Sequence, residues 1–322
     1  MKRLIFILLP LIAASCVKEI YVVPKEDDWE IVLNASFRTG KAVQQVYLSS
    51  STALETTPLH GAAVTCETGG VQYNATEFTD YKDAHTAMYG IEGMVFAPGD
   101  VITLTASKDG RTATAKITVP GRGAISDIKK LRTSDRIWFS ATLTDPSSDE
   151  EWFGLQSVLR IQRGKNPVTE EDGTLRINAR LDPILMDGKP AESETGSLLD
   201  EIINGIFGEN RILFSDRNFK GGKADVRFFS NVSDITMRLP AEPEEDENQR
   251  ITGLKAVFTL TTYSKSHFRY RQASDVADLM SSIPEIMMFI EPVVLPANVT
   301  GGLGFVSATT VFETEIDLGE LL

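Results

Sequence analysis

Side chains able to do chemistry are few and scattered in this 322-residue sequence. The three histidines, His60, His85 and His267, have no second histidine or cysteine at ligand spacing, which argues against a structural zinc or copper site. The acidic residues lie in blocks rather than at the alternate positions of a calcium loop. The nucleophile motif G-x-S-x-G does not occur, and no glycine-rich loop opens a helix. We therefore expect no catalytic residue, no bound metal and no cofactor.

Cys16 is the residue whose context predicts a reaction. Lys2 and Arg3, an apolar run over 4–14 and three small residues form a secretory signal. Such a run spans only about half of a bilayer's hydrocarbon layer, so it is too short for a transmembrane helix. The following string, AASC, resembles the bacterial lipobox, in which cleavage before the cysteine is coupled to its acylation. The sequence predicts a signal peptide over 1–15 and a lipid anchor on Cys16; an ordinary signal with an incidental cysteine is the alternative.

Cys66 is the second cysteine, and acylation of Cys16 leaves it without a disulfide partner. It alternates with Ala62 and Val64 in the string GAAVTCETGG, which places it on the apolar face of a strand. We predict a buried, inert thiol rather than a nucleophile.

Period-two alternation of apolar residues begins at Glu30 and indicates β-strands. The clearest hairpin is VITLTASKDGRTATAKITV, where Asp109 and Gly110 suit a two-residue turn with positive φ. We predict a mainly β protein whose residues 30–120 form an immunoglobulin-like β-sandwich. An acidic tether over 16–29 precedes it, and the glycines at 121 and 123 indicate a hinge after it.

Residues 124–322 predict a second β-rich domain, sandwich or barrel-like, with one or two short helices. Helical spacing of apolar residues indicates helices over 197–207 and about 264–280. The polar stretch DPSSDEE at 145–151 suggests a hairpin loop, and ITMRL at 235–239 suggests a strand. The glycines in VTGGLGF precede a strand and predict a turn with unusual backbone dihedrals. Four N-x-S/T sequons, at Asn34, Asn74, Asn231 and Asn298, are coincidental in a bacterial lipoprotein.

The charge balance argues against one class of partner. The chain has 45 acidic and 32 basic residues, a net charge of −13, and no basic block. Nucleic-acid binding depends on basic surfaces that displace counterions, so we expect no nucleic-acid partner.

Several strings together resemble a single family. They are the lipobox at Cys16, GAAVTCETGG, the APGDVITLTASKDGRTATAKITVP hairpin, RILFSDRNFKGGKADVRF, and TLTTYSKSHFRYRQASDVADL leading to EPVVLPANVTGGLGFVSA. With these strings, the sequence resembles the Bacteroidota outer-membrane lipoproteins grouped as domain of unknown function 4249, often encoded beside TonB-dependent receptors. The resemblance covers nearly the whole mature chain and implies a protein anchored by lipid in the outer membrane. Lys18 and Glu19 are similar to the charged surface-export signal of such lipoproteins, so we expect the cell surface.

The resemblance and the anchor lead to one main expectation. The protein should be a non-enzymatic lipoprotein that binds a ligand for, or docks on, a TonB-dependent nutrient transporter; the resemblance implies no specific ligand. An alternative is a structural subunit of a fimbria-like surface polymer, which would assemble by strand exchange along sheet edges. A third is an enzyme acting on glycans, which would need two carboxylates about 5 to 10 Å apart in a cleft.

Overall fold

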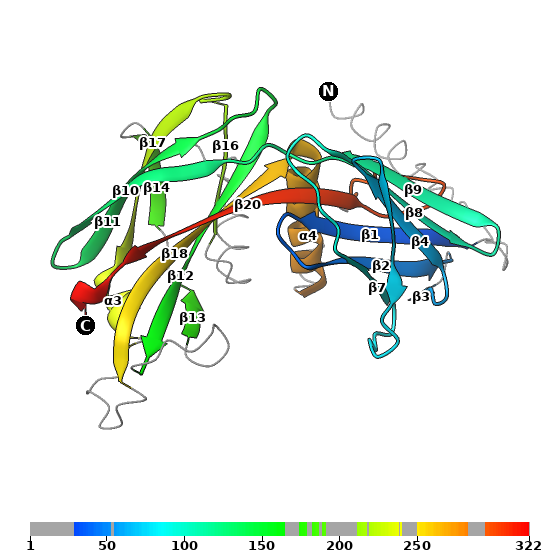
Figure 1. The fold of residues 1–322 in the computed structure, drawn as a ribbon, viewed down its shortest axis with the longest axis horizontal. Coiled ribbons are helices and arrows are strands. Elements are labelled where there is room, and N and C mark those ends of the chain that lie inside the picture. The colour runs from blue at the N-terminus through cyan, green and yellow to red at the C-terminus, as the bar shows by residue number, and fades with distance from the viewer. Residues whose placement is uncertain are drawn as a thin grey trace, which may run out of the picture.

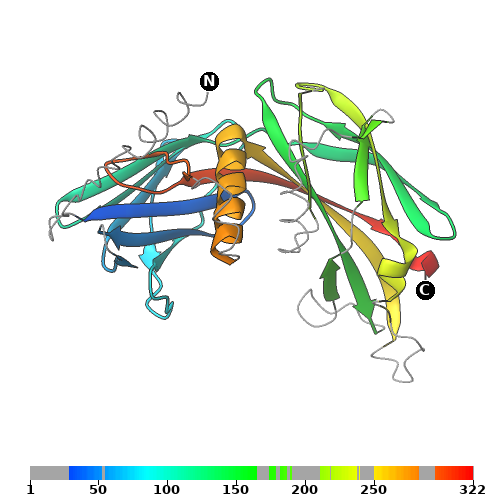
Figure 2. The same ribbon diagram turned by 180° about the vertical axis from the view of Figure 1, so that it is seen from behind.

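A computed structural model describes residues 29–52, 55–164, 174–178, 182–186, 189–190, 211–217, 219–237, 239, 250–282 and 294–321. Three β-sheets dominate these residues, which confirms the predicted mainly β class (Figures 1 and 2). No helix in the described ranges has the length and apolarity needed to cross a membrane. The predicted signal peptide, Cys16, nearly all of the tether and the helix predicted over 197–207 lie outside the described residues.

The largest sheet has ten strands and runs the length of the molecule. Its strands are β1 (Glu30–Arg38), β2 (Val43–Ser51), β3 (Thr56–Pro58), β6 (Thr76–Glu77), β7 (Ala87–Glu92), β12 (Glu151–Arg163), β13 (Thr174–Asn178), β16 (Arg211–Ser215), β18 (Ile251–Ser264) and β20 (Val306–Asp317). Their order is β13-β12-β18-β20-β1-β2-β7-β6, with β16 on β12 and β3 on β2.

Two five-stranded sheets complete the fold, together with helical segments. The second sheet contains β4 (Ala63–Thr68), β5 (Val71–Asn74), β8 (Val101–Lys108), β9 (Arg111–Thr118) and β19 (Val299–Thr300). The third contains β10 (Ala124–Arg132), β11 (Arg136–Thr144), β14 (Asp182–Met186), β15 (Lys189–Pro190) and β17 (Lys223–Asn231). The described helices are α3 (Val232–Thr236), α4 (Lys265–Ser282) and the short 3₁₀ helix η3 (Gly319–Leu321).

Each smaller sheet forms a sandwich with part of the largest sheet, and each sandwich has its own core. In the first, alternate residues of β1, including Leu33 and Phe37, join Leu104 of β8 in one buried cluster. In the second, the ring centroid of Phe139 lies 5.4 Å from that of Phe228 and 5.0 Å from that of Phe258. Burial of these alternating side chains is the main force that holds the sheets together.

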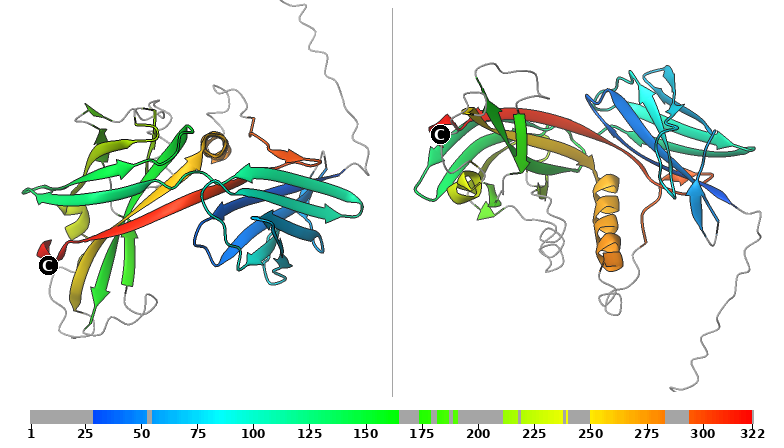
Figure 3. Two further views of the ribbon diagram at one scale, coloured as in Figure 1. Left: turned by 45° about the horizontal axis from the view of Figure 1, so that its top comes forward. Right: turned by 90° about the horizontal axis from the view of Figure 1, so that it is seen from below.

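Strand β20 belongs to both sandwiches (Figure 3). Its first residues pair in parallel with β1, from Ala35↔Val306 to Arg38↔Thr309, and its later residues pair antiparallel with β18 as far as Asp317. The predicted division into 30–120 and 124–322 therefore does not follow the sheets, because the segment around β19 and the start of β20 completes the first sandwich. No local pattern records this pairing, since its partners are far apart in sequence.

Two local predictions are wrong. The segment 145–151 is not a hairpin loop: it crosses from β11 in the third sheet to β12 in the largest sheet. A hairpin is excluded because β10 and β17 occupy both edges of β11. The segment 235–239 is not a strand either, because α3 includes its first residues. Ile235 is buried whereas Met237 is exposed, so the alternate apolar residues do not share a face.

Other local predictions are confirmed. Asp109 and Gly110 have φ values of 49° and 77°, as the predicted tight turn requires. The helix predicted over about 264–280 is α4, which stands at the junction of the two sandwiches (Figures 2 and 3). It contacts both: Phe268 stacks on Trp152 of β12 at 5.3 Å, and Tyr270 stacks on Phe305, next to β20, at 4.2 Å.

Candidate functional site

The residues singled out in the sequence lie apart from one another. Cys66 is fully buried in the first core, which confirms its predicted burial, and burial raises the pKa of its thiol to about 12. His60 and His85 lie in exposed segments of the first sandwich, whereas His267 is buried in α4. In the ranges that the structure describes, no three His, Cys, Asp or Glu side chains are grouped to hold a metal ion.

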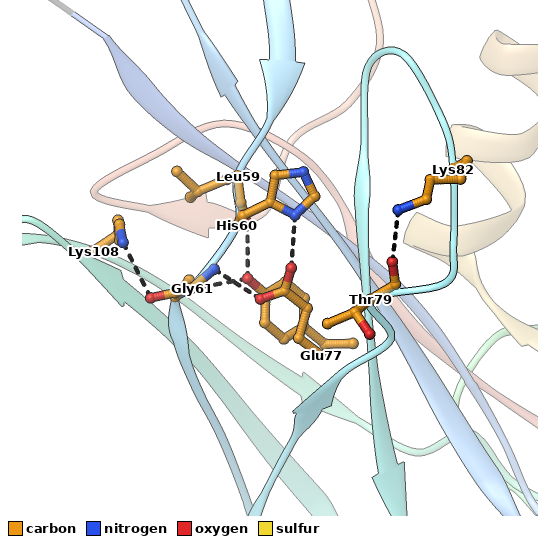
Figure 4. Close-up of polar contacts among 9 residues, drawn as sticks. Leu59, His60, Gly61, Glu77, Thr79, Lys82 and Lys108 are labelled. Atoms are coloured by element: carbon orange, nitrogen blue, oxygen red, sulfur yellow. Dashed lines mark hydrogen bonds and ion pairs between the residues drawn. The ribbon is translucent and has the colours of Figure 1, made fainter.

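His60 is part of a polar cluster on the turn between β3 and β4 (Figure 4). Its Nδ1 lies 2.6 Å from Oε1 of Glu77, whose Oε2 accepts a hydrogen bond of 2.8 Å from the Gly61 N–H. Burial alone would raise the pKa of Glu77, but these hydrogen bonds and the charge of His60 outweigh it and hold the pKa below its usual range. Lys108 donates to the Gly61 carbonyl at 3.2 Å. The cluster fastens the turn to β6.

A second group of charges lies where the linker from β9 meets the second sandwich. Asp145, Glu151 and Asp216 are buried together, with 1%, 3% and 0% of their surfaces exposed. The Glu151 N–H donates to Oδ2 of Asp216 at 2.9 Å, and the Gly121 N–H donates to Oε1 of Glu151. Asp145 accepts hydrogen bonds from the N–H groups of Ser147 at 2.9 Å and of Gly221 at 3.0 Å. The three carboxyls thus tie the linker, the crossover and a surface turn together.

Two of these carboxyls, those of Glu151 and Asp216, have raised pKa values. Burial raises the pKa of Glu151 to about 7, and repulsion from Asp145 and Asp216 adds to the effect. Burial likewise raises the pKa of Asp216 to about 6, with Asp145 as a further cause. The hydrogen bond from Gly121 to Glu151 and that of 3.1 Å from the Gly123 N–H to Thr262 hold the linker that the sequence suggested to be a hinge.

Within the described residues, a groove of about 540 Å³ at the junction of the two sandwiches is suited to binding. Its walls come from the turn between β1 and β2, the linker after β9 and the first half of β20. Three cationic residues line it, Arg38, Lys41 and Arg122, with Glu313 as the one carboxylate. Glu313 lies 3.4 Å from Arg160 of β12 and so already has a cationic partner. We call this feature the junction groove.

The sequence alone missed the junction groove. Arg122 lies more than 80 positions after Arg38 and Lys41, the three carry no motif, and Arg122 appeared only as part of a glycine-flanked linker. A smaller pocket of about 270 Å³ adjoins it, shares Gly40 and Lys41, and is otherwise mainly apolar, with the exposed Val95 on its wall. Neither cavity is lined by two carboxylates, the arrangement that glycan hydrolysis would need.

Comparison with solved structures finds only distant similarity. A DUF4785 family protein from Legionella pneumophila is 10% identical, with 72% of this chain and 52% of that chain covered and a TM-score of 0.24. The adhesin InvE from Yersinia pseudotuberculosis is 11% identical, with 76% and 57% covered and a TM-score of 0.20. Bovine butyrophilin is 9% identical, with 72% and 91% covered and a TM-score of 0.20. This chain spans little more than half the length of the first two proteins.

No curated protein matches the sequence. A family profile does: that of the domain of unknown function DUF4249 matches residues 18–315, which is most of the chain and includes every element that builds the junction groove. The chain therefore belongs to the family of domain of unknown function 4249.

Proposed function

We propose that this protein is a non-enzymatic lipoprotein of the outer membrane, anchored through Cys16 at the cell surface, that binds a ligand for or docks on a TonB-dependent nutrient transporter. The AASC string after the apolar run supports the anchor. Membership of the family and the resemblance of the whole chain to lipoproteins encoded beside such receptors support the partner.

The junction groove is the observation that carries the binding function. It is open, of a size typical of ligand sites, and formed by segments that the fold holds in place. Thr39 and Thr309 fix one wall, because the Thr39 N–H donates to the Thr309 carbonyl at 3.2 Å. The linker wall is tied by the Glu151 and Thr262 hydrogen bonds described above. A groove whose walls are held in this way is preorganised for binding.

The decisive experiment is an affinity purification of the tagged, lipidated protein from outer membranes in mild detergent, followed by mass spectrometry. Stoichiometric recovery of a TonB-dependent receptor is the expected result. Recovery of the protein alone as a monomer would contradict the docking function. Recovery as a ladder of self-polymers would instead favour the structural subunit of a fimbria-like polymer.

The anchor has its own test. Metabolic labelling with an alkyne-tagged palmitate should label the wild-type chain, and Cys16→Ser should abolish the label and release the protein from the membrane fraction. Cys66→Ser is the matched control, because its thiol is buried in the first core and should leave labelling unchanged. Labelling that survives Cys16→Ser would exclude the proposed anchor.

A further inference from the structure

Beside the junction groove, one edge of β20 is open from Thr309 as far as the Asp317 carbonyl, which accepts a hydrogen bond from Lys130 of β10. Pairing with β1 ends at Arg38↔Thr309, while on the other side β20 remains paired with β18 as far as Asp317. Within the described residues no strand pairs with the β1 side of β20 beyond Thr309. The Val311 N–H on this edge is bonded to the Thr39 hydroxyl at 3.1 Å, and by alternation the backbone of Glu313 points to the same side. The groove therefore lies where a strand paired with β20 would stand beyond the end of β1.

The charges around this edge favour an anionic partner. Arg38, Lys41 and Arg122 line the groove, and within the described part of the chain none of the three forms an ion pair. Lys41 donates to Gln45 at 2.8 Å, and the Arg122 guanidinium lies 5.6 Å from the centroid of the Phe312 ring, so both have only neutral contacts. Three uncompensated cations converge here although the whole chain carries a net charge of −13.

We propose that the junction groove binds an extended, carboxylate-bearing segment of a partner protein, which adds to the open edge of β20 where β1 ends. Main-chain hydrogen bonds to the edge supply affinity, as in other cases of strand addition. Carboxylates on the incoming segment meet Arg38 and Arg122, because a guanidinium and a carboxylate pair through two parallel hydrogen bonds. A free inorganic anion would pair with the cationic side chains, but it would leave the backbone groups on the open edge of β20 without hydrogen bonds. This inference rests on the proposed docking function and specifies its surface.

The charge requirement is tested by fluorescence anisotropy with the full mature chain. The probe is a labelled octapeptide of alternating Glu and Thr with blocked ends, and a Lys/Thr octapeptide serves as the charge-swapped probe. The Glu/Thr peptide should bind saturably, and Arg38→Glu or Arg122→Glu should weaken binding at least tenfold. Lys116→Glu is the matched control, since it reverses the same charge at an exposed position of β9 outside the groove. Equal loss in Lys116→Glu, no saturable binding, or equal binding of the Lys/Thr peptide would overturn the proposal.

The strand-addition requirement is tested on the peptide, so that folding of the protein is not at risk. Two versions of the Glu/Thr peptide carry N-methyl groups on alternate residues, one set for each edge of the extended chain. Only the version methylated on the edge facing β20 should bind at least tenfold more weakly. Equal affinity of both versions, or displacement of the peptide by millimolar inorganic phosphate alone, would identify a simple anion site and contradict strand addition.

The two proposals fail in different ways. If the wild type recovers a TonB-dependent receptor and the Arg38→Glu, Arg122→Glu double variant recovers it equally well, the docking function is supported. The junction groove is then not the docking surface. If the wild type recovers no receptor but binds the Glu/Thr peptide as expected, the groove assignment stands and the transporter proposal falls.

Discussion

The side chain of Asn298 bonds to both backbone groups of Val306. Its Nδ2 donates to the Val306 carbonyl at 2.7 Å, and its Oδ1 accepts from the Val306 N–H at 2.8 Å. β18 pairs with this side of β20 only from Thr309 onward. At Val306 the amide therefore makes the hydrogen bonds that a neighbouring strand would otherwise make. Asn34 makes a related contact from β1, where its Oδ1 accepts from the Phe305 N–H at 2.9 Å. Two residues that sequence inspection marks only as sequons therefore fix the start of the strand shared by both sandwiches.

Asn298→Ala should destabilise the protein by about 2 to 4 kcal/mol, because it leaves both backbone groups of the buried Val306 without their partner. Urea unfolding followed by circular dichroism measures the change. Asn74→Ala is the matched control: Asn74 is an exposed sequon residue of β5 and should change stability by less than about 0.5 kcal/mol. Equal stability of the two variants would contradict the role assigned to Asn298.

Stability should fall as pH rises through the range set by Glu151. Its pKa is about 7 in the folded protein against an ordinary value of 4.5, so the folded state keeps a proton that the unfolded chain releases. The contribution of Glu151 to the free energy of unfolding is therefore greatest below about pH 4.5. It decreases by about 3 kcal/mol in total as the pH rises through about 7.

Urea unfolding between pH 4.5 and pH 8 tests this dependence on Glu151. Glu151→Gln should make the fall with pH shallower, because an amide still accepts the Gly121 hydrogen bond but does not titrate. The fall that remains is due to Asp216, whose pKa is also raised, to about 6. Asp149→Asn, at an exposed position of the same crossover, should retain the wild-type profile. If both variants follow the wild-type curve, Glu151 is not the group that titrates.

Gly304 should tolerate no side chain. Its φ is 112°, and a Cβ built on it would lie 2.3 Å from the Leu33 carbonyl oxygen, so an added methyl group must push the segment before β20 away from β1. We expect Gly304→Ala to cost about 3 kcal/mol or more. Gly99→Ala measures the cost of the positive φ alone, because Gly99 has a φ of 85° and nothing lies within 4 Å of its Cβ position. It should cost about 1 kcal/mol. Similar melting temperatures for the two variants would show that contact with β1 is unimportant.

The thiol of Cys66 should be unreactive in the folded state. It has no exposed surface, and burial raises its pKa to about 12, so both access and thiolate population are low. A Cys16→Ser chain treated with Ellman's reagent should release no chromophore when native and one equivalent per chain in guanidinium chloride. Rapid reaction of the native protein would contradict the burial of this side chain.

Local sequence patterns determine the strands of this protein well. Alternation predicts β1, β4, the β8–β9 hairpin and β18, because period-two burial is a property of a few consecutive residues. The same patterns fail for 145–151, since alternation shows that two successive strands each have a buried face but not whether they share a sheet. They fail again at Ile235, which lies in the short helix α3 instead of a strand.

The sequence by itself determined the β class, the burial of Cys66 and the glycine turn before β20, and it predicts the anchor at Cys16. Only the tertiary structure decided that β20 joins both sandwiches and that Arg38, Lys41 and Arg122 line one groove. The reason is physical. Alternation shows which face of a strand is buried, whereas strand pairing depends on backbone hydrogen bonds that any residue can make. The entropy of closing a long loop also changes little with its length. Partners more than 260 residues apart, such as Arg38 and Thr309, therefore leave no local trace of their pairing.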